Sequence, residues 1–85
     1  MLRVEFTIEP FIEGRLEPHV TDAISAVEAR GYRVEIGPFG SSCDVPADDV
    51  GAVVGTLTDA ALGSGASHVT VHVAASDTSP TGTST

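Results

Sequence analysis

Two adjacent hydroxyls, Ser41 and Ser42, follow the turn sequence GPFG at 37–40 and begin a segment that alternates like a strand. Cys43 and Val45 continue this alternation, so Ser41 is expected to face the same side as these apolar side chains. A buried hydroxyl without a hydrogen-bond partner costs about 1–3 kcal/mol. Two interpretations stay open: Ser41 bonds nearby backbone at the strand end, or it orients a ligand in a pocket between sheet and helices.

The other side chains that could carry chemistry are too dispersed for a familiar catalytic or metal site. His68 and His72 share one face of a strand but lie about 13 Å apart along it, too far for one metal ion. They and His19 are therefore expected to be surface histidines. Cys43 is the one thiol, so an internal disulfide and a cysteine-rich zinc site are excluded, and its inward position predicts a structural residue.

The acidic cluster of Asp44, Asp48 and Asp49 precedes the second helical pattern. Its spacing differs from that of a calcium loop, and carboxylates at this place interact favourably with the helix dipole. The glycine-rich segment GSGAS at 63–67 precedes a strand pattern and so lacks the helix N-terminus that would bind phosphate. The sequence thus contains no recognisable catalytic centre, and a non-enzymatic protein without a cofactor is predicted.

Composition narrows the possible partners. The chain has 85 residues, with twelve acidic and four basic residues and a net charge of −8. This charge argues against nucleic acid and against anionic membrane surfaces. The first residues contain no apolar signal segment, and no run approaches the ~20 apolar residues of a membrane span, so a cytoplasmic protein is expected. A domain this small has a narrow stability margin, which pairing with a second copy would relieve.

Hydrophobic periodicity predicts the order β-α-β-β-α-β. Pro18 suits the first turn of a helix, and Gly31 suits its C-terminal cap. Each helix has a single apolar stripe, so both must cover the same face of a four-stranded antiparallel sheet, an α+β ferredoxin-like fold. The expected strands are 2–8, 32–36, 41–45 and 67–75, and the expected helices are 18–30 and 46–62. Residues 1–75 are expected to form one domain, followed by a disordered polar tail at 76–85.

The outer face of this sheet, away from the helices, is expected to be polar. It would face either water or another protomer. Alternation assigns eight residues to it: Glu5, Thr7, Arg33, Glu35, Ser42, Asp44, Thr70 and His72.

The segment GPFGSSCDV at 37–45 resembles the hairpin of the YkoF-like thiamine-binding family. That family has Pro, a hydrophobic residue, Gly and Thr before a hydrophobic residue, Glu and Gly. Pro38, Phe39 and Gly40 match this pattern, and Ser41 stands in the place of the Thr. Asp44 stands in the place of the Glu, whereas the residue after it departs from the family's Gly. Together with the flanking strands and helix, the resemblance extends over about residues 2–75.

This resemblance implies a domain that binds thiamine or its hydroxymethylpyrimidine half, in salvage, transport or sensing. Because the chain holds one copy of a domain that relatives use in tandem or as oligomers, it also implies a homodimer or homotetramer. A structural or regulatory module that oligomerises through the open sheet face is the alternative. The residues expected at the ligand site are Phe39, Gly40, Ser41 and Ser42, with Asp44 and Glu9 near the pocket mouth.

Overall fold

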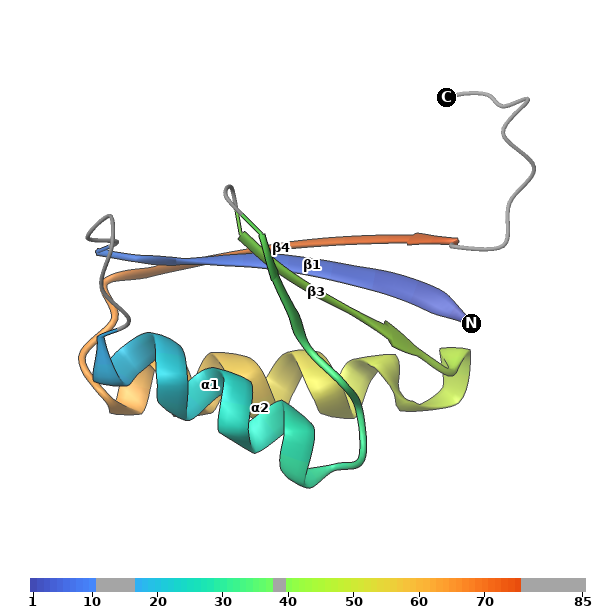
Figure 1. Ribbon diagram of the computed structural model, residues 1–85, viewed down its shortest axis with the longest axis horizontal. Coiled ribbons are helices and arrows are strands. Elements are labelled where there is room, and N and C mark those ends of the chain that lie inside the picture. Colours follow the sequence, from blue (N-terminus) through green and yellow to red (C-terminus); the bar gives the residue numbers. More distant parts are fainter. Residues whose placement is uncertain (11–16, 38–39, 76–85) are drawn as a thin grey trace.

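The predicted α+β ferredoxin-like fold is confirmed by the computed structural model, which describes residues 1–10, 17–37 and 40–75. One layer is an antiparallel sheet, and the other consists of two helices that cover one of its faces (Figure 1). The elements follow the predicted order: β1 (Leu2–Glu9), α1 (Pro18–Ala29), β2 (Glu35–Gly37), β3 (Gly40–Val45), the short 3-10 helix η1 (Ala47–Asp49), α2 (Val50–Gly63) and β4 (His68–Ala75).

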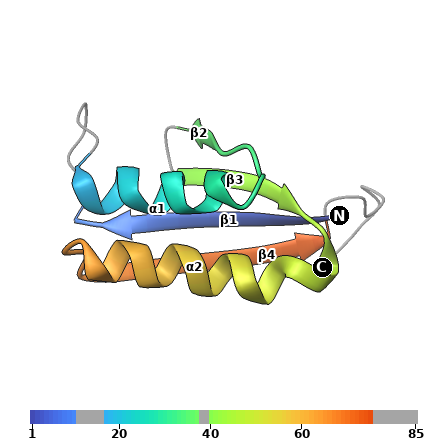
Figure 2. The same cartoon turned by 90° about the horizontal axis from the view of Figure 1, so that it is seen from below.

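The strands are arranged in the order β2-β3-β1-β4, so β1 is central and β2 and β4 form the two edges. Phe6 of β1 lies opposite Ser41 on one side and Val71 on the other, and Glu5 lies opposite Ser42 and His72. Because neighbouring residues of a strand point to opposite faces, this register separates an apolar face from a polar one. Helix α2 runs beside β4, and α1 lies toward β3 (Figure 2).

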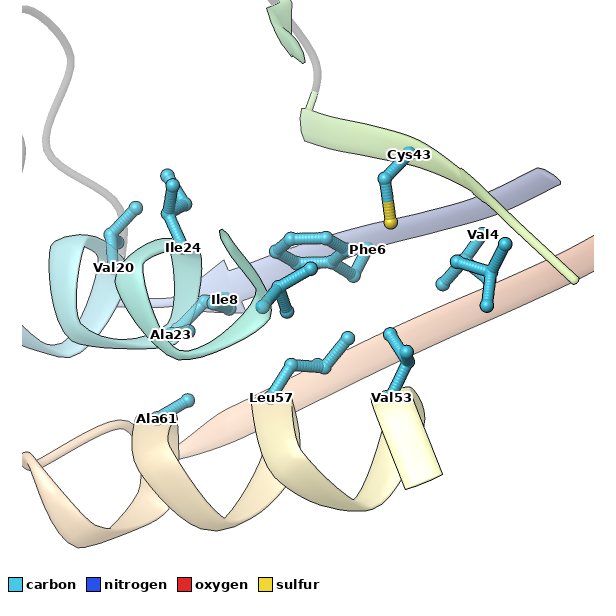
Figure 3. Close-up of a cluster of buried hydrophobic side chains, with 12 residues drawn as sticks. Val4, Phe6, Ile8, Val20, Ala23, Ile24, Cys43, Val53, Leu57 and Ala61 are labelled. Atoms are coloured by element: carbon cyan, nitrogen blue, oxygen red, sulfur yellow. The ribbon is translucent and has the colours of Figure 1, made fainter. Parts of the chain in front are cut away.

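The core occupies the space between the sheet and the helices (Figure 3). Alternate residues of β1 meet the apolar stripes of both helices there. Cys43 lies among them and is buried, as its inward position in the strand pattern predicted. Burial raises the pKa of its thiol, with the Asp44 carboxylate adding to the effect, so the reactive thiolate is disfavoured. The buried apolar residues are Val4, Phe6, Ile8, Val20, Ala23, Ile24, Val27, Cys43, Val45, Val53, Leu57 and Ala61.

The second strand is shorter than predicted, because 32–34 connect the end of α1 to the sheet. Tyr32 donates its hydroxyl to Asp49 at 2.6 Å, and the Val34 backbone N–H donates to Glu28 at 3.5 Å. Arg33 therefore lies outside β2, in the connection between α1 and the sheet. The second helix also begins later than predicted, at Val50, because 47–49 form the 3-10 turn.

The prediction that all three histidines lie on the surface is wrong for His19. His68 and His72 are exposed, but His19 is buried at the start of α1. Its Nε2–H donates to the Pro10 carbonyl at 2.6 Å, which connects the first turn of the helix to the residue that follows β1. A buried polar ring is accommodated by such a bond. The expected tail at 76–85 lies outside the described residues.

Asp49 connects the end of α1 to the start of α2, and this contact predicts a pH-dependent stability. Hydrogen bonds from Tyr32 and Arg30 (2.9 Å) hold the pKa of Asp49 below its usual value. The contact therefore stabilises the fold above the unfolded-state pKa of an aspartate and is lost as the pH falls through the lowered folded-state value. Asp49→Asn should lower the melting temperature by a few degrees at neutral pH, measured by circular dichroism.

The same variant should lose less of its stability than the native chain between pH 6 and pH 3, because the titrating group is gone. Tyr32→Phe removes one of the two hydrogen bonds and should give an intermediate dependence. An Asp49→Asn protein whose melting temperature falls with acid as steeply as that of the native chain would contradict this assignment.

Candidate functional site

A hollow of about 480 Å³ lies on the open face of the sheet, on the side away from the helices. All four strands contribute to it, because the register aligns Glu35, Ser42, Glu5 and His72 in one row across the sheet. Side chains on this row alternate with those that face the core. The outward-facing lining residues are Arg3, Glu5, Thr7, Glu35, Ser42, Thr70 and His72.

Arg3 is surrounded by carboxylates at one side of this hollow. Its Nη2 donates to Ser42 Oγ at 2.9 Å. Its guanidinium nitrogens lie 3.6 Å from Glu5 Oε2, 3.6 Å from Asp44 Oδ1 and 4.0 Å from Glu35 Oε1. Half-exposed ion pairs of this kind contribute little to stability individually. Three carboxylates around one guanidinium leave the local charge negative, which favours a cationic or hydrogen-bond-donating ligand.

A second hollow of about 280 Å³ adjoins the first, since Arg3, Glu35 and Ser42 line both. Asp44 borders this smaller hollow, together with the segment that connects α1 to β2. Ser42 therefore borders both recesses.

The structure brings together some of the expected site residues. Gly40, Ser41 and Ser42 border the larger hollow, and Asp44 borders the smaller one. Glu9 is elsewhere: it ends β1, and its carboxylate lies 3.7 Å from His68 Nδ1, away from both hollows. Phe39 lies outside the described residues.

Ser41 faces the helices, as the alternation predicted, and is only 8% exposed. It lies between Ile36 and Phe6 in the register. Within the described residues, no hydrogen bond of its hydroxyl is found, so the bond to nearby backbone, one of the two interpretations left open, is not made there. However, the hollow beside it lies on the opposite side of the sheet from the pocket expected between sheet and helices. The hydroxyl that faces this hollow belongs to Ser42.

Gly40 allows β3 to start close against β1, and its replacement should be costly. Its φ is +149°, and a Cβ added there would lie 2.8 Å from Thr7 Cγ2 and 2.9 Å from the Phe6 carbonyl oxygen. Gly40→Ala should lower the free energy of unfolding by about 1–3 kcal/mol from backbone strain, with the steric clash adding to this loss. Denaturant unfolding measures the change.

Gly31→Ala is the matched control for this substitution. Gly31 also has a positive φ, +100°, but a Cβ there would meet nothing within 4 Å. It should therefore cost only the backbone term, about 1 kcal/mol. Equal losses at the two positions would show that the close approach of β3 to β1 contributes nothing.

The three aspartates of the acidic cluster lie in different surroundings and do not form one site. Asp49 makes the contact to Tyr32 and Arg30, Asp44 pairs with Arg3 on the sheet, and Asp48 is exposed in η1. Across 1–10, 17–37 and 40–75, no three His, Cys, Asp or Glu side chains are grouped closely enough to hold a metal ion. None of the helices in this part of the chain is long and apolar enough to cross a bilayer.

Several lining residues were placed on the outer face from the sequence but not assigned to a site. Alternation alone put Glu5, Glu35 and His72 there. Their convergence depends on the register between strands far apart in the chain, which periodicity does not give. Arg3 had the same signal, an outward position on the first strand, and its acidic neighbours could be found only from the pairing of β1 with β3.

These features define a small ferredoxin-like domain with a polar, acidic recess on its open sheet face. The sequence model described as "Thiamine-binding protein" matches residues 4–84. The chain therefore belongs to the thiamine-binding protein family, and the resemblance noted in the hairpin and its flanking elements is confirmed. This family is named for binding and not for a reaction.

Solved structures support the same fold. A domain of unknown function, DUF77, from Bacillus cereus is 23% identical, with a TM-score of 0.61 over 85% of this chain and 70% of that chain. Protein SP2199 from Streptococcus pneumoniae is 16% identical, with a TM-score of 0.53 over 85% of this chain and 80% of the other. At these identities the similarity concerns the fold alone. No curated protein matches the sequence.

Proposed function

We propose that this protein binds thiamine or its hydroxymethylpyrimidine moiety without transforming it, and that the ligand occupies the larger hollow on the open sheet face. Such a protein would serve salvage, transport or sensing. Membership of the thiamine-binding family supports the ligand class. The convergence of Glu5 and Glu35 with Ser42 around Arg3 is the observation that carries the location.

The chemistry of the ligand complements this row of side chains. The aminopyrimidine ring has an amino group that donates hydrogen bonds and ring nitrogens that accept them. Carboxylates of Glu5 and Glu35 can accept from the amino group, and the hydroxyls of Thr7 and Thr70 can donate to the ring nitrogens. The thiazolium ring is cationic, so the negative local charge attracts it.

The dimensions are also suitable. A volume of about 480 Å³ lies within the ~300–1,000 Å³ range of small-molecule sites. Two hollows that share Ser42 offer places for the two linked rings of thiamine. The pyrimidine alone would need only one of them.

Calorimetric titration of the full chain tests this proposal. Thiamine and hydroxymethylpyrimidine should both release or absorb heat with saturation. Thiamine diphosphate should bind more weakly than thiamine, because its phosphates would meet the carboxylates of Glu5 and Glu35. An absence of heat with all three at millimolar concentration, or the tightest binding with the diphosphate, would refute the proposal.

We also propose that the domain self-associates as a dimer or tetramer, in keeping with its small core. The alternative function, an oligomerisation module without a small-molecule ligand, makes a distinct prediction: assembly without any heat of ligand binding. Native mass spectrometry of the protein from its own cells separates the two, since it reports the stoichiometry and any retained ligand together.

A further inference from the structure

Two glycines face each other where β2 ends and β3 begins. Gly37 is the last residue of β2 and Gly40 the first of β3, and they are partners in the register. Two positions further along, the next pair on the same face is Glu35 with Ser42, which points to the open side of the sheet. Both glycines line the larger hollow. This glycine pair therefore leaves part of the hollow's floor without side chains.

The backbone requires a glycine at only one of these two positions. Gly40 has a φ of +149°, and a Cβ there would collide with Thr7 and with the Phe6 carbonyl oxygen. Gly37 has no positive φ, and among the described atoms a Cβ there would meet only the Gly40 carbonyl oxygen, at 3.3 Å. A glycine weakens a strand, and where the backbone does not need it, it often marks the close approach of a ligand.

Polar side chains border the bare floor. Side chains stand roughly perpendicular to a sheet, so Glu35 and Ser42 rise beside the glycine pair on one side. Thr7 rises beside Gly40, since a Cβ added to that glycine would lie 2.8 Å from Thr7 Cγ2, and Thr70 follows on β4 opposite Thr7. Neighbouring strands are about 4.8 Å apart, so the glycine pair leaves a flat area wide enough for one aromatic ring.

We infer that the aminopyrimidine ring of the ligand lies flat on the glycine pair, and that Gly37 is the positioning residue that keeps this place open. The inference rests on the proposed function and deepens it by assigning the place of one ring. The edge of a ring in this position meets the polar border. Glu35 can accept from the amino group, and the hydroxyls of Ser42 and Thr7 can donate to ring nitrogens. Ser42 Oγ accepts its own hydrogen bond from Arg3, so its hydrogen can be donated.

The same geometry defines the class of ligand as a flat heteroaromatic ring with an amino group at its edge. Carbon atoms attract each other best at about 3.5–4.0 Å, and a gap larger by about 0.5–1 Å loses a quarter to a half of that attraction. A Cβ at Gly37 would add about 1.5 Å to the floor, the length of one carbon–carbon bond. The ring would be lifted beyond this gap and would lose its contact with the peptide groups.

Gly37→Ala tests the inference by calorimetric titration. The affinities for thiamine and for hydroxymethylpyrimidine should fall alike, by about ten- to two-hundredfold, as for one surplus carbon in a fitted pocket. A loss of charge would instead affect mainly the cationic thiamine. Gly55→Ala is the matched control, because Gly55 is exposed on α2 and a Cβ there meets nothing within 4 Å. It should leave both affinities unchanged. Circular dichroism establishes that both variants are folded.

A flat fragment provides a second readout on the native chain, which does not depend on the folding of a variant. Protons beneath the face of an aromatic ring are shielded, so saturating 4-aminopyrimidine should move the amide proton signals of Gly37 and Gly40 upfield. Such shifts without any binding of thiamine would refute the proposed function and support the inference.

Three results would overturn the inference and leave the proposed function standing wherever thiamine still binds. They are equal thiamine affinities of the native chain and Gly37→Ala, a loss of affinity for thiamine without a loss for hydroxymethylpyrimidine, and a lack of upfield shifts at the glycine pair with both the fragment and hydroxymethylpyrimidine.

Discussion

The double variant Glu5→Gln with Glu35→Gln is expected to weaken thiamine binding by about ten- to a hundredfold. Each substitution removes one negative charge from the hollow while keeping the size of the side chain. Two carboxylates within ~5 Å of a thiazolium contribute about 1–3 kcal/mol at the effective dielectric of a half-exposed site. Calorimetric titration of the native and variant chains measures the change.

Titration with hydroxymethylpyrimidine shows whether the loss of affinity comes from the lost negative charge or from a changed shape of the hollow. It is neutral, so the double variant should change its affinity much less than that of thiamine. Asp48→Asn with Asp59→Asn is the matched control, because it removes two exposed carboxylates from the helix side of the molecule. If that control weakens thiamine binding equally, the effect comes from net charge and the hollow is not the site.

Leu57→Ala is expected to give the largest loss of stability, about 2–5 kcal/mol. Leu57 is fully buried in the centre of α2, where it packs against β1 and α1 (Figure 3). Truncation removes apolar contacts and leaves a cavity. In a domain of this size, each 1 kcal/mol corresponds to about 4–8 °C in melting temperature, so the loss is easily measured by thermal unfolding.

Leu62→Ala is the control on the same helix. Leu62 is 49% exposed, so its truncation should cost about 1 kcal/mol or less. Comparable losses at the two positions would mean that the apolar stripe of α2 does not face the sheet as described.

The sequence predicted the fold because its signals are local and agree with one another. Alternation in β1 and β3 separated Ser41 from Ser42 correctly, with Ser41 buried and Ser42 on the open face. Gly31 ends α1 with a φ of +100°, as a C-cap glycine should. Each of these features depends on residues close together in the sequence. The alternation of strand residues and the residue preferences at helix ends therefore predict them.

Long-range contacts could not be predicted in the same way. Tyr32 continues the strand pattern in sequence, yet its hydroxyl bonds Asp49, seventeen residues away, and the second strand is shortened. His19 is polar at a helix start, yet it is buried against Pro10. The position of the hollow depends on the register that brings Glu5 beside Ser42 and Glu35, so alternation alone did not predict a hollow on the open face.

A ¹H–¹⁵N correlation spectrum of the full chain, titrated with thiamine, tests the location of the site most directly. We expect saturable shifts confined to the strands that line the hollow, at 3–7, 35–37, 40–42 and 70–72, with little change along α1 and α2. Shifts concentrated on the helix side, around Val20 and Ile24 of α1, would place the ligand between sheet and helices. That result, or the absence of any saturable shift at millimolar thiamine, would contradict a thiamine site on the open sheet face.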